Sequence, residues 1–437
     1  MFVASRRAFL ASSVAGLAAG RLLAADAPVG KIVDADKAVD GPTFHPDTLF
    51  LTWQRDPTTT MTVQWVGTAG ETADTKVYFA PAKEGTPAAG AKAKDKSWPG
   101  VATTPKPYPM TDFKVYRAEL TGLTPGTDYQ FKIGKSSGVY RFRTAPAKAT
   151  DAIAFVSGGD CGVNQHAVAN NQQAARQDPL FALIGGDLAY ENGKSAEISL
   201  GFLRNYSRHM VARDGRMIPM VACIGNHEVD GGYDKPREKA PFYYALFDGL
   251  FRDTGYAALD FGDYLSLVLL DSGHTSKIGG DQADWLERVL KARADHPNVF
   301  CVNHVPAYPS YRNYQGNTEK VGTGEGNRTH WVPLFEKYRV PVVLEHHDHT
   351  FKRTKPLIGG HVNSNGVLYL GDGSWGRLRN PKKPDELPYL AASSRDYHLS
   401  LHRIQGQERF HLALDEFGRV MDVARTGQRK AGIVTAG

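Results

Sequence analysis

The sequence is poor in cysteine and has no long hydrophobic run, and each shortage excludes a class of protein. Its 437 residues include three cysteines, Cys161, Cys223 and Cys301, an odd and small number that provides no disulfide framework. Each lies in or beside an apolar run, so we interpret all three as buried thiols. No apolar run reaches the ~18–20 residues that a membrane-spanning helix requires, so we predict no membrane span.

The chain also lacks the strong positive charge of many nucleic-acid-binding proteins. Its 52 lysines and arginines exceed its 46 acidic residues by 6. The first 25 residues contain Arg6, Arg7 and Arg21 and no acid, so without them 49 basic residues would face 46 acids, a net charge of +3. So weak a charge predicts no nucleic-acid partner. A hydrophobic fraction of 41% is ordinary for a globular protein and excludes wholesale disorder.

The N-terminus has the organisation of a removable export signal. Arg6 and Arg7 are followed by Phe9-Leu10, then by a small-residue apolar stretch over 11–19 and a possible cleavage site ending at Ala25 or Ala27. A charged start, a short apolar middle and a small-residue end are typical of a signal peptide, and the paired arginines resemble the twin-arginine signal. Residues 1–27 are therefore predicted to be a twin-arginine signal peptide, and the mature chain is expected to be periplasmic or secreted.

A β-rich domain is predicted over residues 42–146. Apolar and polar residues alternate in several runs between Phe44 and Thr144, a pattern typical of an antiparallel β-sandwich. The stretch from Leu123 to Tyr129 resembles the tyrosine-corner turn of fibronectin type III domains. Residues 81–109 are rich in proline, lysine and alanine without periodicity and predict a long loop. No cluster of catalytic residue types occurs here, which favours a supporting role.

Residues 150–430 show a different pattern, in which strand-like apolar runs alternate with helical stretches. The apolar runs are Ile153–Ser157, Phe181–Ile184, Ile218–Ile224, Tyr264–Leu270, Val299–Val302 and Val340–Leu344. Asp281 is predicted to cap a helix with Trp285, Leu286, Val289 and Leu290 on its inward side. This alternation predicts a parallel or mixed sheet covered by helices, and the last 60 or so residues return to a strand pattern.

Five of these apolar runs end in polar residues that suit metal binding. The polar endings are Gly158-Gly159-Asp160, Gly185-Gly186-Asp187-Leu188-Ala189-Tyr190, Gly225-Asn226-His227-Glu228, Asn303-His304 and Glu345-His346-His347-Asp348-His349. Strand carboxyl ends line the ligand site of an α/β sheet, so we expect these residues to meet at one edge. Each motif alone is weak, since a single Gly-Asp or Asn-His is more often a turn. Their joint occurrence at strand ends is specific.

The chemistry that this set suggests is a centre of two metal ions. Carboxylate and imidazole ligands suit divalent metals or Fe(III). Two histidines spaced i, i+2 in an extended loop can reach two neighbouring metals, and one carboxylate can bridge them. Two metals ~3.5–4 Å apart clamp a phosphoryl group and lower the pKa of a bound water.

The order GD…GDxxY…GNHE…H…HxH resembles that of the calcineurin-like metallophosphoesterases. Tyr190, three residues after the second aspartate, and the β-rich domain in front resemble the purple acid phosphatase branch. The resemblance covers nearly all of the mature chain. It implies an all-β, fibronectin III-like sandwich followed by an α/β catalytic domain of four layers, with two mixed β-sheets flanked by helices.

The resemblance also implies a role for each motif residue. The first metal, typically Fe(III), would be bound by Asp160, Asp187, Tyr190 and His349. The second, Zn, Mn or Fe(II), would be bound by Asp187, Asn226, His304 and His347. Asp187 would bridge the two. Tyr190 would be the phenolate responsible for the family's colour. His227 would contact the phosphate or protonate the leaving group, held in place by a hydrogen bond that it donates to Glu228.

The chain departs from the family pattern at two places. His346, preceded by Glu345, stands where the last motif usually has glycine. The histidines that plant members carry about ten residues after the fourth-motif histidine are missing, and Arg312 lies in that stretch instead. Arg312 either binds substrate phosphate through its two-pronged guanidinium or faces solvent.

Three functions follow in order of preference. The first is a secreted phosphatase that hydrolyses small phosphate monoesters by attack of metal-bound hydroxide. The second is a phosphodiesterase acting on nucleotide or phospholipid-type diesters, because Arg312 is the only obvious cation for a monoester dianion. The third is a surface binding protein without activity, which the complete set of ligands disfavours. The sequence leaves the oligomeric state open.

Overall fold

The computed structural model describes residues 44–68, 72, 74–82, 98–149, 153–313, 323–406 and 408–427. The predicted signal peptide lies outside these residues. No helix in the described part of the chain is long and apolar enough to cross a membrane. All three cysteines are buried thiols, as predicted, and burial raises the pKa of Cys223 to about 12.

The N-terminal domain is a sandwich of two four-stranded antiparallel sheets. In sheet order, the first contains β1 (Phe50–Thr52), β2 (Met61–Val66), β6 (Lys114–Leu120) and β5 (Thr104–Pro107). The second contains β4 (Gly100–Val101), β3 (Val77–Pro81), β7 (Asp128–Ile133) and β8 (Tyr140–Arg143). Buried and half-buried residues alternate along β7, as the sequence pattern predicts. The tyrosine corner is present, because the Tyr129 hydroxyl accepts a hydrogen bond from the Thr124 N–H at 2.9 Å.

The prediction of a loop over 81–109 is wrong for its last part. Strands β4 and β5 both lie there, each at the edge of its sheet. An edge strand with little buried surface needs no alternation of apolar residues, and Pro105 and Pro107 are tolerated in β5 because only one side of an edge strand is paired. Periodicity therefore gave no signal for either strand.

The catalytic domain has the predicted four layers, with two mixed sheets between helices. The six-stranded sheet runs β11 (Met220–Ala222), β10 (Ala182–Ile184), β9 (Ile153–Gly158), β21 (His398–Gln405), β22 (Glu408–Asp415) and β23 (Val420–Thr426). The seven-stranded sheet runs β12 (Ala257–Phe261), β13 (Leu265–Leu269), β14 (Val299–Asn303), β15 (Val342–Glu345), β19 (Leu368–Asp372), β16 (Phe351–Thr354) and β20 (Leu390–Ser394). Phe155 of one sheet meets Phe300 of the other edge to face, with ring centroids 5.2 Å apart.

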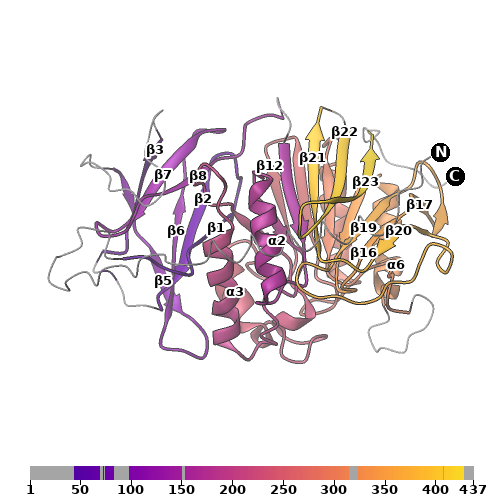
Figure 1. Cartoon of the computed structure of the whole chain (residues 1–437), viewed down its shortest axis with the longest axis horizontal. Helices are drawn as coiled ribbons and strands as arrows, with labels where there is room; N and C mark the ends of the chain where they lie inside the picture. Colours follow the sequence, from indigo (N-terminus) through magenta and orange to yellow (C-terminus); the bar gives the residue numbers. More distant parts are fainter. Residues whose placement is uncertain are drawn as a thin grey trace, which may run out of the picture. The chain divides into compact units, whose positions relative to one another are not determined.

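Helices cover the outer faces of both sheets. The longer helices α2 (Gln165–Arg176) and α3 (Ala196–His209) lie beside the six-stranded sheet (Figure 1). A separate apolar cluster joins the seven-stranded sheet to α5 (Asp281–Ala292), to Trp331 and to α7 (Val332–Lys337), and α6 (Glu325–His330) directly precedes Trp331. The remaining short elements are η2 (Asn226–Glu228), η3 (Arg237–Lys239), α4 (Pro241–Phe247), β17 (Leu357–Ile358) and β18 (His361–Val362). Helix α5 buries Leu286 and Leu290, as predicted, and Trp285 and Val289 are partly buried against the same cluster. The prediction that Asp281 caps this helix is wrong, because Gly280 is the N-cap and Asp281 is the first helical residue.

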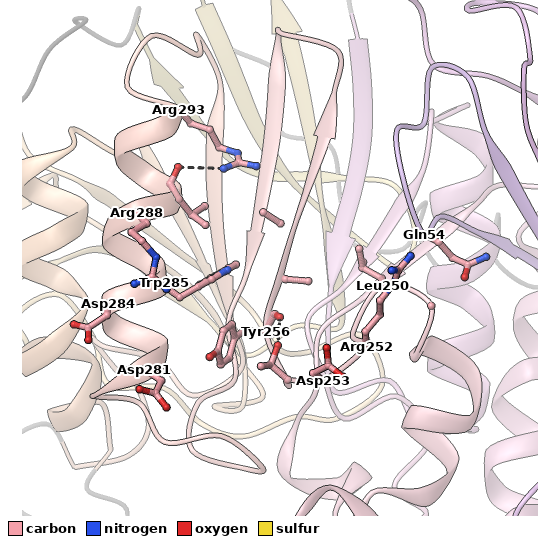
Figure 2. Close-up of a pocket in the computed structure, with 15 residues that line it drawn as sticks. Gln54, Leu250, Arg252, Asp253, Tyr256, Asp281, Asp284, Trp285, Arg288 and Arg293 are labelled. Atoms are coloured by element: carbon pink, nitrogen blue, oxygen red, sulfur yellow. Dashed lines mark hydrogen bonds between the residues drawn. The ribbon is translucent and has the colours of Figure 1, made fainter.

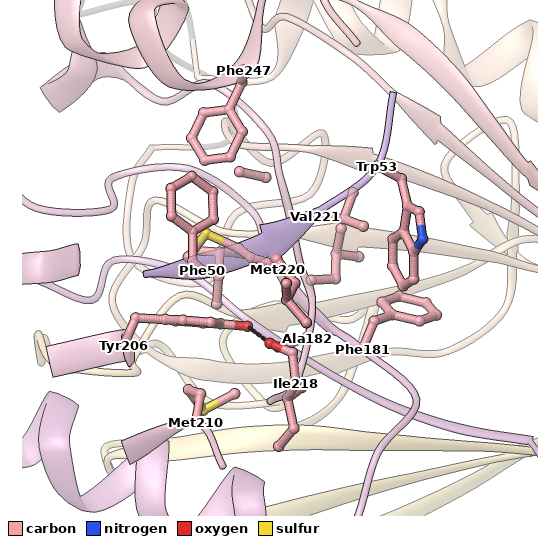
Figure 3. Packing of buried hydrophobic residues seen from close by; sticks show 14 of the residues in the cluster. Phe50, Trp53, Phe181, Ala182, Tyr206, Met210, Ile218, Met220, Val221 and Phe247 are labelled. Carbon is pink, nitrogen blue, oxygen red and sulfur yellow. Dashed lines mark hydrogen bonds between the residues drawn. The ribbon is translucent and has the colours of Figure 1, made fainter. Parts of the chain in front are cut away.

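The sandwich domain packs directly on the catalytic domain through a shared apolar core. Figure 3 shows Phe50 and Trp53 beside Phe181 and Phe247 of the catalytic domain. Trp53 meets Phe181 edge to face at 6.1 Å between ring centroids. The Gln64 side-chain amide also donates a hydrogen bond to the Leu246 carbonyl at 2.9 Å. The sandwich thus buries part of the catalytic domain's apolar surface, which agrees with a supporting role.

Buried histidines between the sheets make stability depend on pH. Burial lowers the pKa of His398 to about 4 and that of His402 to about 3, whereas each titrates near 6.5 when the chain unfolds. Below pH 6.5 the unfolded state therefore binds more protons, so stability is complete above that pH and is lost as pH falls towards the folded pKa values. Each group contributes a slope of up to about 1.4 kcal/mol per pH unit.

We therefore expect the free energy of unfolding in urea to decrease as pH is lowered from 7 to 4.5. His398→Met should reduce the slope of that decrease by the contribution of one histidine, up to about 1.4 kcal/mol per pH unit. His361→Met is the matched control, because His361 lies on the exposed hairpin strand β18. An unchanged slope in His398→Met would show that another group is responsible.

Candidate metal centre

The five polar motifs meet at one edge of the paired sheets, as the sequence predicts. Asp160 follows β9, Asp187 follows β10, and Asn226 begins the 3-10 turn η2 after β11. His304 and the His347–His349 loop follow the neighbouring strands β14 and β15. Strands β9, β10 and β11 are parallel, and so are β14 and β15, so the carboxyl ends within each set point the same way. Each sheet therefore supplies part of the site.

Sharp turns bring these side chains inward. Residues with left-handed backbone are Asp160 (φ 58°), Asp187 (φ 54°), Tyr190 (φ 69°), His347 (φ 68°) and His349 (φ 59°). Such values are uncommon outside glycine and typically occur where function imposes them. Gly186, beside Asp187, has φ 97°, and a Cβ there would lie 2.7 Å from the His304 ring. Only glycine at position 186 allows this turn to approach the His304 ring so closely.

The first group of donors contains Asp160, Asp187 and His349, whose ligand atoms lie within 4.8 Å of one another. Tyr190 joins them, because its hydroxyl lies 3.2 Å from Asp160 Oδ1 and 3.0 Å from His349 Nε2. Burial, with the nearby Asp160 charge, raises the pKa of Tyr190 well above its usual value. A cation bound by this group would favour the phenolate instead.

The second group contains Asp187, His304 and His347, also within 4.8 Å of one another. His304 Nε2 lies 3.3 Å from Asp187 Oδ1, 3.1 Å from His347 Nδ1 and 3.2 Å from Asn226 Oδ1. The structure thus brings together the residues predicted for each metal.

Asp187 is common to both groups, and its two oxygens differ. Oδ1 accepts a hydrogen bond from the His227 backbone N–H at 2.8 Å. Oδ2 is buried and has no hydrogen-bond partner among the residues that the structure describes. A buried carboxylate oxygen without a partner is costly unless a cation or proton compensates it, so the atom fits a metal ligand.

The electrostatics also favour a cation. Burial alone would raise the pKa of Asp187, but His304 and His227 together hold it below its usual value. Burial alone would lower the pKa of His304, but the charges of Asp187 and Asp160 raise it to about 9. The carboxylates therefore keep a proton on His304, and a bound metal would displace that proton because ligand imidazoles are neutral.

Two further contacts orient the imidazoles. His304 Nδ1 lies 2.9 Å from the Gly185 carbonyl oxygen, to which it donates when its Nε2 is free to bind a metal. His347 Nε2 lies 3.1 Å from the Tyr233 hydroxyl, which leaves Nδ1 facing the second group. No sequence signal points to Tyr233, because it belongs to no motif and comes from the irregular segment after η2.

His227 lies beside the two groups rather than within them. Its ring packs against that of Tyr190 at a centroid distance of 4.3 Å. Its Nδ1 lies 2.5 Å from Asn192 Oδ1, and its Nε2 lies 3.9 Å from Asp187 Oδ2. The side chain is 34% exposed, so solvent or substrate can reach it, and burial lowers its pKa.

The expected contact of Glu228 with His227 is wrong. The Glu228 carboxylate accepts hydrogen bonds from the backbone N–H groups of Gly225, Asp187 and Leu188 at 2.7–2.8 Å. It ties two metal-binding turns together, and Asn192 holds His227 instead. Burial, with the charge of Asp187, raises the pKa of Glu228 to about 8.

Arg312 and His346 lie next to the donor groups but do not belong to them. The Arg312 guanidinium donates to the His347 carbonyl at 2.5 Å and to Asp348 Oδ1 at 3.1 Å, with 11% of the side chain exposed. This pairing does not favour the predicted phosphate contact, which stays a prediction. The His346 ring packs against Gly159, where a Cβ would lie 2.6 Å from it, so the extra imidazole occupies space left by the glycine.

A separate cavity lies away from these residues. It has a volume of about 620 Å³ and is lined by residues that include Tyr256, Trp285 and Arg252 (Figure 2). None of the predicted metal ligands lines it.

Comparisons with known proteins agree with the site. Residues 46–144 match the family model described as "Purple acid Phosphatase, N-terminal domain", and residues 159–351 match "Calcineurin-like phosphoesterase". Purple acid phosphatase 21 of Arabidopsis thaliana is 25% identical over 307 residues, which cover 67% of each protein. Acid phosphatase type 7 of Homo sapiens is 26% identical over 340 residues, which cover 70% of this chain and 76% of that protein.

A solved structure shows the same fold. The purple acid phosphatase PPD1 from yellow lupin superposes with a TM-score of 0.68 at 16% identity, over 87% of this chain and 74% of that chain. The chain is thus a metallophosphoesterase, an enzyme that hydrolyses phosphoric esters. Within that class it is purple acid phosphatase-like, because residues 46–144 match the N-terminal domain of that family and its relatives include purple acid phosphatase 21.

Proposed function

We propose that this enzyme is an exported phosphatase that hydrolyses phosphate monoesters with two metal ions. Asp160, Asp187, Tyr190 and His349 would hold the first, and Asp187, Asn226, His304 and His347 the second. The observation that carries the proposal is Asp187, which belongs to both donor groups and has a buried oxygen without a partner. Fe(III) suits the phenolate-containing group, and Zn, Mn or Fe(II) suits the second.

The chain's own residues then perform the remaining steps. The bound metals would polarise the phosphoryl oxygens and lower the pKa of a water. His227, next to Asp187 and partly exposed, would contact the phosphoryl group and donate a proton to the leaving alcohol from Nε2. Asn192 would fix the His227 ring through its Nδ1. Glu228 would hold the two turns at their spacing.

Export by the twin-arginine pathway is part of the proposal. Its support is the sequence from Ser5 to Leu10 and the small-residue stretch that follows. A fusion of residues 1–27 to a reporter that is active only after export should require both Arg6 and Arg7. Export that is unchanged in Arg6→Lys/Arg7→Lys would contradict it.

The activity is tested by hydrolysis of p-nitrophenyl phosphate and of its bis-ester across pH, with metal content measured on the same sample. The proposal expects two metals per chain and a higher kcat/KM for the monoester. A preference for the bis-ester would make the enzyme a phosphodiesterase. No turnover of either ester by a fully metallated protein would contradict the proposal.

Replacing Tyr190 with phenylalanine tests the first metal's ligand set. The hydroxyl contacts both Asp160 and His349, so its loss should abolish visible absorption from a phenolate–Fe(III) pair. The fold should remain, because the ring packing on His227 is retained. The measurement is an absorption spectrum of the iron-loaded protein, and an unchanged spectrum would exclude Tyr190 as the chromophore.

Replacing Asn192 with leucine tests the orientation of His227. Loss of the Oδ1 acceptor should lower kcat for an alkyl phosphate by about 10 to 100-fold, the usual range for groups that orient a functional histidine. A nitrophenyl ester, whose leaving group needs little protonation, should be affected much less. Asn192→Asp restores an acceptor and should recover most of the activity. An equal loss on both esters would exclude a role in proton donation.

A further inference from the structure

Two arginines that form no ion pair in the described part of the chain lie beside the first donor group. Both belong to the segment after β19. The Arg377 guanidinium lies 4.2 Å from the centre of the Tyr190 ring. The Arg379 Nε–H donates to His349 Nδ1 at 3.3 Å, and its guanidinium lies 4.9 Å from the ring centre of Tyr311. Arg377 is exposed and Arg379 is partly exposed.

Several other arginines in this domain pair with aspartates. Arg293 pairs with Asp260 at 2.6 Å, and Arg353 pairs with Asp422 at 2.6 Å. Arg312, the predicted phosphate contact, is likewise paired with Asp348. Arg377 and Arg379 therefore place unneutralised positive charge at the edge of the site. Guanidinium groups favour planar anions such as phosphate and carboxylate, which they bind through two hydrogen bonds.

A metal at the first site would make Arg379 more available. His349 faces Asp160 and Tyr190 through Nε2. An imidazole that binds a metal through Nε2 carries its proton on Nδ1, which can then no longer accept from Arg379. The Arg379 donors are then available to another acceptor.

The position of Arg377 indicates which part of a substrate it would meet. Its guanidinium lies over the Tyr190 ring, whereas the Tyr190 hydroxyl lies among the donors. The Tyr190 side chain thus lies between Arg377 and the ligand atoms. Two bound metals and His227 would together meet the reacting phosphoryl group, so the remaining cations suit a different anionic group of the same substrate.

We infer that Arg377 and Arg379 form a subsite for a second anionic group, so that the enzyme favours substrates with another phosphate or a carboxylate near the scissile bond. This inference rests on the proposed function, because it assumes that the reacting phosphoryl group occupies the donor groups. Substrates of this class are organic diphosphates and phosphorylated carboxylic acids.

The inference is tested by binding, independently of turnover. Calorimetry on the metal-loaded protein compares methylphosphonate, which has one anionic group, with methylenediphosphonate, which has two and cannot be hydrolysed. Metal content is measured after each titration, to exclude extraction of the metals. We expect methylenediphosphonate to bind more tightly. Arg377→Ala/Arg379→Ala should weaken it by about tenfold or more and weaken methylphosphonate by a smaller factor.

Kinetics give the second measurement. The ratio of kcat/KM for an alkyl diphosphate to that for the matching alkyl monophosphate should fall about tenfold in Arg377→Ala, mainly through KM. The matched control is Arg252→Ala, because Arg252 is an exposed arginine that lines the separate cavity, and its ratio should not change.

The outcomes separate the two proposals. Equal affinity of the wild-type protein for both phosphonates, or an equal loss of both in the double variant, overturns the inference and leaves the phosphatase proposal intact. Selective phosphonate binding by a fully metallated protein without turnover of any ester contradicts the proposed function and retains the subsite.

Discussion

Asp187→Asn is expected to remove metal binding and hydrolysis together. The carboxylate is the only side chain common to both donor groups, and asparagine offers one neutral oxygen in place of two charged ones. The Oδ1 atom of asparagine can still accept the hydrogen bond from the His227 backbone, so the turn itself should persist. We expect fewer than one metal per chain after loading, and a fall in kcat/KM on the order of 10³-fold or more.

The measurements are elemental analysis of the loaded protein and turnover of p-nitrophenyl phosphate. Asp253→Asn is the matched control, because Asp253 is exposed and lines the separate cavity, and both quantities should match the wild type. The circular dichroism of Asp187→Asn should remain that of a folded protein. Two metals per chain in this variant would show that Asp187 does not bridge them.

The sequence was sufficient to predict the residues of the donor groups. Each one directly follows a strand or lies within three residues of a motif glycine or aspartate, and parallel strands bring such ends to one edge. The position of Tyr190 also followed from the motif, because only three residues separate it from Asp187. Local sequence therefore carried most of the information about which side chains meet at this edge.

The contacts around the ligands were not predictable in the same way. Glu228 accepts from three backbone N–H groups, and that choice depends on how two turns approach each other in space. Asn192 and Tyr233 reach His227 and His347 across gaps of 35 and 114 residues. Arg377 and Arg379 lie in a segment without a motif, so only the structure places them beside Tyr190 and His349 respectively. The spacing of residues in the sequence does not show which of these distant side chains contact each other.

The strands were predicted where burial imposes a recognisable pattern of apolar residues on the sequence. Six strands of the catalytic domain, β9 to β11 and β13 to β15, were visible as apolar runs because they are buried on both faces. Strands β12, β16 and β19 were not predicted. Strands β4 and β5 were missed because an edge strand exposes most of its side chains. The sequence also flagged Glu345 as an unusual acid near the metals, without indicating that Lys352, seven residues later, neutralises it.

Lys352→Met is expected to be the most destabilising single substitution near the site. The Lys352 ammonium lies 2.5 Å from Glu345 Oε2 and also donates to the Tyr308 carbonyl, and both side chains are essentially fully buried. Without its partner, Glu345 would be an uncompensated charge among buried strands. Breaking such a pair from one side typically costs about 3–5 kcal/mol, measured here as a fall in the free energy of unfolding in urea.

The double variant Glu345→Gln/Lys352→Met separates the charge from the packing. Glutamine can still accept the Ala307 backbone N–H, which Glu345 holds at 2.6 Å, so the loop that carries His304 keeps its attachment to β15. Removing both charges should recover most of the lost stability, because the cost of the single variant lies in one unpaired buried ion rather than in lost attraction. If the double variant unfolds as easily as Lys352→Met, then the methylene packing of Lys352 or its bond to Tyr308 stabilises this loop, and the ion pair is not the reason that Glu345 stands beside the metal ligands.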